Sequence, residues 1–105
     1  MYLFSITINI EDSFRDEWLA WVTPKLRVLL EDKALVQDFR LLKILSEEPN
    51  NGSTYSFQYA LATVEALAVF GEHYDQSIAL GMYRLYKDKF VEFRTQLEIV
   101  DWKFL

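Results

Sequence analysis

Residues 2–10 have the sequence YLFSITINI, in which apolar side chains fall at every second position. Successive side chains of a β-strand point to opposite faces, so alternate residues share a face. One face would carry the apolar set Tyr2, Phe4, Ile6, Ile8 and Ile10, and the other would carry Leu3, Ser5, Thr7 and Asn9. We therefore expect a strand whose isoleucine-rich face lies in the core.

A helix is predicted next, because apolar residues recur at steps of three and four over residues 14–30. Pro24 interrupts this pattern. Proline inside a helix removes a hydrogen bond and clashes with the preceding turn, at a cost of about 3 kcal/mol. We expect either a kink at residues 20–24 or two helical pieces, over 13–22 and 24–32.

Two further strands are predicted over residues 35–46 and 54–62. They are joined by EEPNNGS, whose proline, asparagines and glycine are typical of a hairpin connection. Thr63 is placed to cap a second helix that begins at Val64 and ends near residues 86–89.

The last predicted strand covers residues 91–100, again with alternating side chains. Because a buried face is expected to be the more apolar one, we place Val91, Phe93, Thr95, Leu97 and Ile99 toward the core. The opposite face of this strand would then carry Glu92, Arg94, Gln96 and Glu98.

The predicted order β-α-β-β-α-β is that of the ferredoxin-like α+β fold, in which two helices cover one face of a four-stranded antiparallel sheet. A chain of 105 residues buries about two-thirds of its surface on folding, enough for one hydrophobic core. We therefore expect residues 1–105 to form a single domain.

The sheet face without helices admits two interpretations. Antiparallel sheets often expose one face to water. Alternatively, this face meets a second copy of the chain to form a dimeric α/β barrel, which we favour because a small one-sided sheet gains much from a partner. The residues that we expect in this interface are Asn9, Arg40, Gln58, Arg94 and Glu98. In a buried interface their charges would have to pair, so replacing Arg94 with alanine should weaken association.

Composition excludes several classes of function. The formal net charge of −5 disfavours binding to nucleic acid or to an anionic membrane surface, and no apolar run is long enough to span a membrane. The absence of cysteine excludes disulfides and thiolate metal sites. The three glycines are isolated from one another, so no phosphate-binding loop is present. We expect a cytoplasmic protein without a metal or cofactor.

Four stretches resemble a known family: YLFSITINI, EWLAWV at residues 17–22, LLKIL followed by YSFQYA at 55–60, and DKFVEFRTQLEIV at 88–100. Together they are similar to a small bacterial domain-of-unknown-function family grouped with the dimeric α/β-barrel proteins. This resemblance implies the fold and the homodimer, and it brings no established activity. Relatives often carry a histidine midway along the first helix, a position where this chain has none.

No catalytic set can be assembled from the sequence. His73 is the only histidine, and we expect it at the surface or at a helix end. Trp18 and Trp21 are expected in the core, with a small-molecule pocket between the helices and the sheet as the alternative. Tyr55, Phe57 and Tyr59 also fall on the core face of their strand, which excludes RNA stacking.

We accordingly predict a homodimeric structural protein, or one that binds a small apolar ligand. The alternative is a cofactor-free monooxygenase or isomerase that acts on a flat aromatic or quinol-like substrate. In that enzyme Asn9, His73 or a tryptophan would orient the substrate. An open apolar cavity that reaches Asn9 or His73 would favour the enzyme, whereas a filled core would favour the structural or binding protein.

Overall fold

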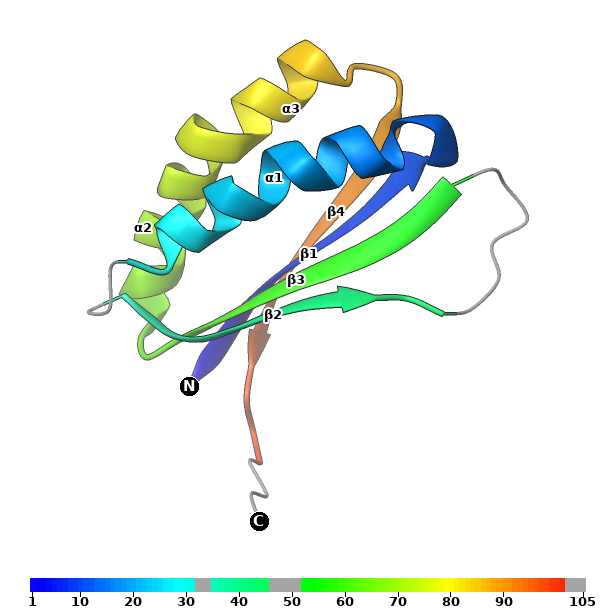
Figure 1. Cartoon of the computed structure of the whole chain (residues 1–105). Helices are drawn as coiled ribbons and strands as arrows, with labels where there is room; N and C mark the ends of the chain where they lie inside the picture. The colour runs from blue at the N-terminus through cyan, green and yellow to red at the C-terminus, as the bar shows by residue number, and fades with distance from the viewer. Residues whose placement is uncertain (32–34, 46–51, 102–105) are drawn as a thin grey trace.

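The computed structural model describes residues 1–31, 35–45 and 52–101. Two helical segments lie side by side above one face of a sheet (Figure 1). In chain order the elements are β1 (Tyr2–Glu11), the 3-10 helix η1 (Asp12–Phe14), α1 (Arg15–Leu29), β2 (Val36–Lys43), β3 (Gly52–Leu61), α2 (Val64–Tyr74), the π-helix η2 (Asp75–Ala79), α3 (Leu80–Leu85) and β4 (Phe90–Glu98). This order confirms the predicted α+β arrangement.

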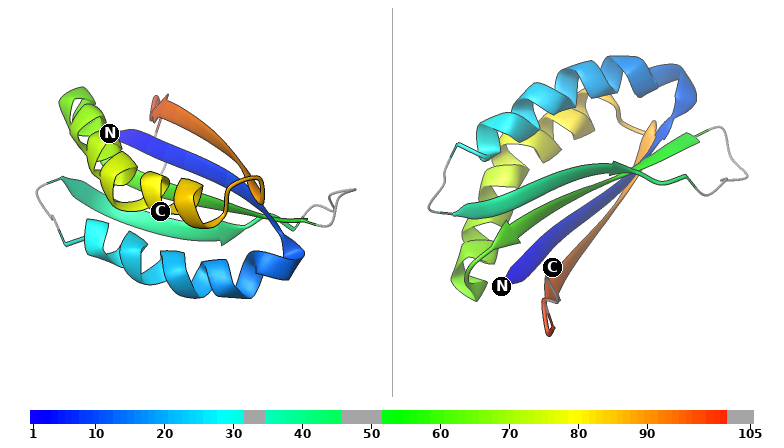
Figure 2. Two further views of the ribbon diagram at one scale, coloured as in Figure 1. Left: turned by 90° about the horizontal axis from the view of Figure 1, so that it is seen from above. Right: turned by 60° about the horizontal axis from the view of Figure 1, so that its bottom comes forward.

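The four strands form an antiparallel sheet in the order β2-β3-β1-β4. The strand β1 lies inside the sheet, where Ile6 pairs with Phe57 on one side and with Arg94 on the other. α1 and the α2–η2–α3 segment lie over the same face of this sheet, as the view from above shows (Figure 2). The helix α2 packs on β1 and β3 and leaves the edge strand β4 less covered.

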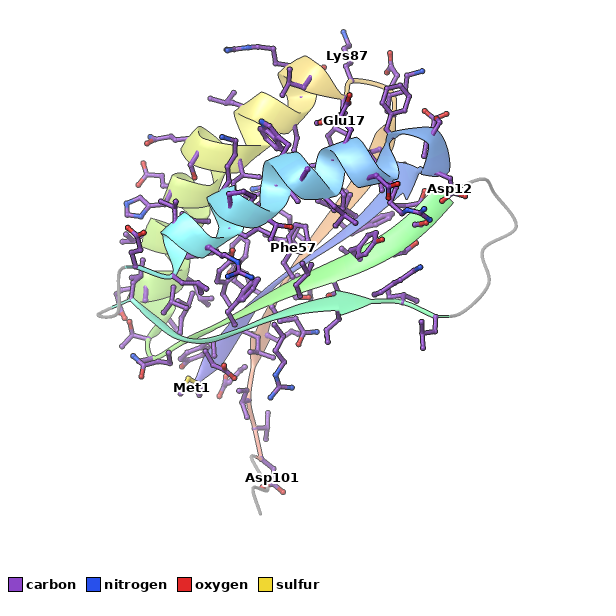
Figure 3. The ribbon with its side chains drawn as sticks, in the orientation of Figure 1. Met1, Asp12, Glu17, Phe57, Lys87 and Asp101 are labelled. Atoms are coloured by element: carbon purple, nitrogen blue, oxygen red, sulfur yellow. The ribbon has the colours of Figure 1, made fainter. Side chains whose placement is uncertain are left out.

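The core lies between this face and the helices, as β1 predicts. Ile6, Ile8 and Ile10 are fully buried, and Phe57 points from β3 toward the helices (Figure 3). Trp18 of α1 stacks on Phe57 with a centroid separation of 5.9 Å. The sequence pattern therefore identified this part of the core correctly.

The helix α1 runs without a break and contains Pro24, so of the two predicted alternatives the one with two separate pieces was wrong. Pro24 is exposed, and so is Ala20, whose carbonyl oxygen loses its usual hydrogen-bond donor to the proline. Water can satisfy a carbonyl group on the exposed side of a helix, which lowers the cost of the missing bond.

The second helical segment begins as predicted. The Thr63 side chain caps α2 by accepting a hydrogen bond of 3.1 Å from the backbone N–H of Ala66. The segment ends at Leu85, slightly earlier than expected, and its middle is the π-helix η2. A π-helical turn inserts an extra residue into a helix and is frequent at functional sites. Nothing in the sequence predicted it.

The strand β4 has its faces exchanged relative to the prediction. Since Ile6 points toward the helices and pairs with Arg94, the even-numbered residues of β4 lie on the helix side of the sheet. The odd-numbered Val91, Phe93 and Leu97 lie on the other side and are exposed. The expectation that these three belong to the core was wrong.

Two predictions fall outside the described residues. The predicted hairpin connection between β2 and β3 includes residues 46–51, and the apolar C-terminal tail, which the sequence predicts to dock on the protein, includes residues 102–105. Within the described ranges, no helix has both the length and the apolarity needed to cross a membrane.

Candidate ligand groove and open sheet face

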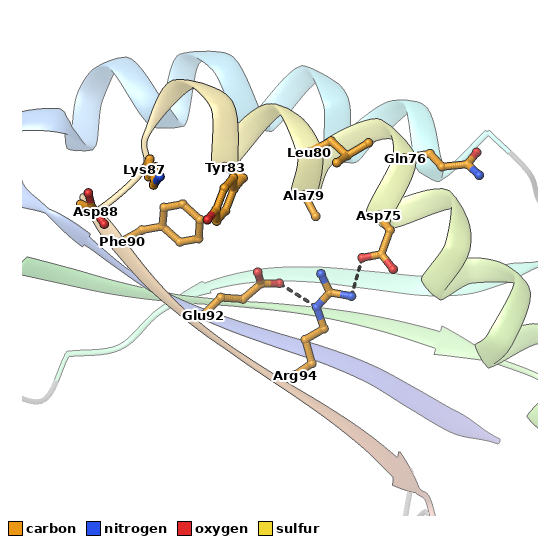
Figure 4. Close-up of a pocket in the computed structure, with 10 residues that line it drawn as sticks. All are labelled: Asp75, Gln76, Ala79, Leu80, Tyr83, Lys87, Asp88, Phe90, Glu92 and Arg94. Carbon is orange, nitrogen blue, oxygen red and sulfur yellow. Dashed lines mark hydrogen bonds and ion pairs between the residues drawn. The ribbon is translucent and has the colours of Figure 1, made fainter.

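A groove runs between β4 and the second helical segment (Figure 4). Its volume is about 560 Å³, which is within the range of small-molecule sites. Its walls are Asp75, Gln76, Ala79, Leu80, Tyr83, Lys87, Asp88, Phe90, Glu92 and Arg94. We call this the β4 groove.

Two structural features form the β4 groove. The first is the position of α2 over β1 and β3, which leaves the helix side of β4 partly open. The second is η2, which supplies Asp75, Gln76 and Ala79 to the helical wall. The opposite wall comes from Phe90, Glu92 and Arg94, since alternate residues of a strand share a face.

Arg94 links the two walls. Its Nε donates to Glu92 Oε1 at 2.9 Å, and its Nη1 lies 2.5 Å from Asp75 Oδ1. The guanidinium carbon also lies 5.0 Å from the centre of the Tyr74 ring, which is a cation–π distance. Burial opposes the charge of Arg94, but the carboxylates of Asp75 and Glu92 outweigh this effect and raise its pKa. The guanidinium is therefore a fixed, charged group.

The Tyr74 hydroxyl lies beneath this cluster, buried and without a hydrogen bond. Burial raises the pKa of Tyr74, and the neighbouring Glu92 carboxylate raises it further. Tyr74 thus stays uncharged and contributes a rigid ring under Arg94. Its hydroxyl does not have the lowered pKa that a catalytic base would need.

The rest of the β4 groove is largely apolar. Leu80 and Tyr83 project from α3, and Phe90 lies opposite Tyr83 (Figure 4). The Lys87 ammonium lies 5.6 Å from the centre of the Tyr83 ring. An aromatic and aliphatic surface beside one fixed polar group can hold a small molecule and orient it.

The face of the sheet opposite the helices carries both polar and apolar residues. We call it the open sheet face. It consists of Leu3, Ser5, Thr7 and Asn9 of β1, Asp38, Arg40 and Leu42 of β2, Thr54, Ser56, Gln58 and Ala60 of β3, and Val91, Phe93, Thr95 and Leu97 of β4. The side chains at its centre are small and polar, and those at its β4 margin are apolar, with Phe93 66% exposed.

Three of the predicted interface residues lie on the open sheet face. Asn9 donates a hydrogen bond of 2.9 Å from its Nδ2 to Thr54 Oγ1, across neighbouring strands. Arg40 is exposed and lies 3.9 Å from Asp38, measured from Nε to Oδ2. Gln58 is half-buried beside Arg40.

The other two predicted interface residues do not lie there. Arg94 and Glu98 are on the helix side of β4, as their pairing with Ile6 and Tyr2 requires. The prediction that all five residues share one surface was therefore wrong. The cause is the exchange of the two faces of β4.

The predicted pocket residues are also separated. Trp18 is fully buried in the core, and its indole N–H has no hydrogen bond. Trp21 is half-buried against Gly81 and Tyr86. His73 is exposed in a shallow depression between α1 and the second helical segment, and it is not part of the β4 groove.

Sequence reasoning missed the β4 groove. One signal was present, because Glu92, Arg94 and Glu98 give β4 charges at positions that a fully covered strand would fill with apolar residues. No signal marked η2. Within the described ranges, no group of three His, Cys, Asp or Glu side chains is placed to hold a metal ion.

Comparison with solved structures identifies similar folds. The chain is similar to a dimeric ferredoxin-like protein from an uncultured marine organism, with 8% identity and a TM-score of 0.74 over 97% of this chain and 98% of that one. A second dimeric ferredoxin-like protein from an uncultured marine organism has 17% identity and a TM-score of 0.63, over 100% and 99%. An antibiotic biosynthesis monooxygenase has 16% identity and a TM-score of 0.55, over 96% and 100%.

At these identities the likeness shows the fold alone. No curated protein matches the chain. A family model does match, over residues 1–100, and its family is described as a domain of unknown function. No specific reaction comes with this match, in agreement with what the sequence indicated. The chain belongs to the domain-of-unknown-function family DUF4286.

Proposed function

We propose that this protein is a homodimeric binding domain, in which each subunit holds a small, partly apolar molecule in its β4 groove. The observation that carries the proposal is the composition of that groove. A volume of about 560 Å³ is lined by the apolar Leu80, Tyr83 and Phe90 and by one fixed guanidinium, that of Arg94. Such a combination of apolar surface and one placed polar group is typical of ligand sites.

The charges of the β4 groove favour an uncharged ligand. Lys87 and Arg94 are outnumbered by the carboxylates of Asp75, Asp88 and Glu92, so an anion would be repelled. Arg94 already uses Nε and Nη1, which leaves donors on its Nη2 for a carbonyl or hydroxyl oxygen. The ligand would therefore place a ring against Tyr83 and an oxygen atom near Arg94.

The open sheet face supports the homodimer. Its apolar margin, formed by Val91, Phe93 and Leu97, would leave water if a second copy covered it. Burying one such side chain contributes about 1.5–3 kcal/mol. Two proteins of similar fold are described as dimeric, which is in keeping with this assembly.

Ligand binding can be tested with menadione, an uncharged bicyclic molecule with two carbonyl oxygens. NMR titration of the protein should move the resonances of Leu80, Tyr83, Phe90 and the Arg94 Nε. Leu80→Lys should weaken binding at least tenfold, because Leu80 lines the groove. Leu85→Lys is the matched control: Leu85 is 56% exposed against 60% for Leu80, and it lies outside the groove. Equal binding by the two variants would exclude the β4 groove as the site.

The assembly can be tested by light scattering over a dilution series. The wild-type protein should have twice the mass of one chain at high concentration. Phe93→Lys should reduce the mass toward that of a monomer, because it places a charge in the proposed interface. Val28→Lys introduces the same charge at another exposed apolar position, on α1, and should leave the mass unchanged. A monomeric wild-type protein would overturn the homodimer.

The cofactor-free oxygenase stays the alternative prediction, and an antibiotic biosynthesis monooxygenase of similar fold is in keeping with it. None of the residues that line the β4 groove is a histidine, and Asn9 lies on the opposite side of the sheet. Oxygen uptake in the presence of menadiol or other quinols would favour the enzyme.

We also propose one domain over residues 1–105 and a cytoplasmic location. Limited proteolysis tests the first, and cell fractionation the second.

A further inference from the structure

A second hollow adjoins the β4 groove and shares Asp75 and Arg94 with it. Its volume is about 510 Å³, and its other walls include Phe4, Leu67 and Ala68. Asp75 and Arg94 stand at the end of the β4 groove that is farther from Lys87 (Figure 4). The two hollows therefore lie on either side of one ion pair.

Gly71 keeps the second hollow open. This glycine is part of the wall, and a Cβ atom at its position would lie 3.4 Å from the Phe4 ring. A larger side chain at residue 71 would occupy the space between α2 and Phe4. The lining of this hollow is apolar at the exposed Ala68 and at the buried Phe4 and Leu67, and it is polar at Glu72 and Gln96. Leu80, Tyr83 and Phe90 supply the apolar lining on the other side of the ion pair.

The ion pair presents a hydrogen-bond donor next to an acceptor. Arg94 Nη1 forms an ion pair with Asp75 Oδ1, whereas Nη2 of the arginine and Oδ2 of the aspartate have no hydrogen bond within the described part of the chain. The Asp75 side chain is also well exposed, so a ligand can reach it. An amide group has the complementary pair, because its carbonyl oxygen accepts and its N–H donates.

We infer that the two hollows form one elongated site for an uncharged amide, which places its C(O)–NH group at Arg94 and Asp75 and an apolar group in each hollow. This inference rests on the proposed function of the β4 groove, and it names the class of ligand. The walls extend from Phe90 to Gln96 along β4, or about 20 Å at 3.3 Å per residue. The class includes short apolar peptides and N-acyl amines.

N-benzylhexanamide is a suitable probe, since it has a ring, an amide and an alkyl chain in a row. Benzyl hexanoate is its matched partner: the ester keeps the shape and the carbonyl oxygen but has no N–H. We expect calorimetry or NMR titration to give an amide Kd at least fivefold lower than that of the ester. This difference should disappear in Asp75→Ala, which removes the acceptor.

Two variants of α2 test the second hollow. Ala68→Phe fills it from an exposed helical position and should raise the Kd of the amide at least tenfold. Val69→Phe places the same side chain at the next exposed position, outside both hollows, and should change little. Menadione, which needs the β4 groove alone, should bind to both variants as to the wild-type protein. Circular dichroism checks that both variants fold.

The outcomes separate the inference from the proposed function. If menadione binds but Ala68→Phe leaves the Kd of the amide unchanged, the elongated site is wrong and the β4 groove stands. Equal affinity of the wild-type protein for amide and ester would likewise overturn the role of Asp75. If neither menadione nor the amide binds to the wild-type protein, both the inference and the proposed function fail.

Discussion

Gly81 allows α3 to approach α1 closely. A Cβ atom at this position would lie 2.6 Å from Cζ2 of Trp21, well inside van der Waals contact. The Trp21 ring is held on its other sides by the edge-on ring of Tyr86, at a centroid distance of 5.9 Å, and by the Lys25 ammonium, at 5.0 Å. The tryptophan thus has little room to move away.

Gly81→Ala is expected to lower the free energy of unfolding by about 1 kcal/mol. Alanine gains about 1 kcal/mol over glycine in a helix, but overpacking costs about 1–3 kcal/mol. Gly71→Ala is the matched control, because its Cβ would meet Phe4 at an ordinary contact distance of 3.4 Å. That control should be stabilised by up to about 1 kcal/mol. Urea denaturation measures both, and a stabilised Gly81→Ala would contradict the packing argument.

Two buried tyrosines with large pKa increases, Tyr59 and Tyr74, make stability depend on alkaline pH, and burial raises the pKa of Tyr86 by less. Burial raises the pKa of Tyr59 and of Tyr74 above the value of about 10 expected in the unfolded chain. The folded protein therefore keeps two protons that the unfolded chain loses. Their stabilising effect is fully present below pH 10 and is lost as the pH rises toward the raised folded-state pKa values.

Through Tyr59 and Tyr74, the free energy of unfolding should fall above pH 10 by up to about 2.7 kcal/mol per pH unit, which is about 1.4 kcal/mol per pH unit for each proton. Denaturation between pH 9 and 11.5 measures this slope. Tyr74→Phe should reduce the slope by one proton at no cost near neutral pH, since the hydroxyl of Tyr74 makes no hydrogen bond. Tyr59→Phe should reduce the slope by the same amount. This variant also loses the hydrogen bond of 3.3 Å that the Tyr59 hydroxyl donates to the Leu26 carbonyl oxygen. If the slope is unchanged in both variants, the buried tyrosines are not the cause of the pH dependence.

At the scale of the element, α1 contains Pro24, a residue that the helix does not need for its stability. Pro24 is exposed in the interior of the helix, so its ring contributes little packing. It leaves the carbonyl group of Ala20 without its helical partner. The helix persists because Trp18, Val22 and Leu26 on its opposite side are buried in the core.

Pro24→Ala should raise the free energy of unfolding by about 2 kcal/mol. Alanine is favoured over proline by about 3 kcal/mol inside a helix, and the more flexible unfolded chain offsets about 1 kcal/mol of this gain. Urea denaturation measures the change. Hydrogen exchange should also find the new amide of residue 24 protected. A variant of unchanged stability with an unprotected amide would mean that α1 is already broken at this position.

Sequence alone predicted the elements that carry many buried residues. β1 and β3 have one face against the helices, so alternation identified Ile6, Ile8 and Phe57 correctly. β4 is an edge strand that the helices barely cover, and its apolar residues lie on the face of the sheet away from the helices. Alternation gives two faces without saying which one is inside. The register of β4 with β1, in which Arg94 pairs with Ile6, shows which face of β4 lies inside.

The candidate site could not be predicted from the sequence for the same reason. It depends on the face of β4 and on η2, a π-helix that no residue pattern marks. Arg94 was recognised as a residue of interest, but its partners Asp75 and Tyr74 come from another element. By contrast, the open sheet face was predicted in part, because Asn9 and Gln58 belong to strands whose faces were assigned correctly. The faces of β2 were left undecided by its apolar residues on both sides, and the pairing of Arg40 with Gln58 decides them.

At the scale of the whole molecule, β4 separates two surfaces. Its odd-numbered residues, including Phe93, belong to the open sheet face, and its even-numbered residues, including Arg94, line the β4 groove. Under the proposed function, association and ligand binding therefore depend on neighbouring residues that point in opposite directions. This arrangement reverses the expectation that replacing Arg94 would weaken association.

Arg94→Met should leave the mass of the dimer unchanged and weaken menadione binding at least tenfold, because it removes the guanidinium from the groove and nothing from the open sheet face. It should also cost some stability, since the Glu92 side chain is only 17% exposed and loses its partner. Phe93→Lys should do the reverse: the mass falls toward that of a monomer, and menadione still binds. Light scattering and NMR titration of the same samples measure both properties. A loss of mass in Arg94→Met equal to that in Phe93→Lys would mean that the helix side of β4 contacts the partner subunit.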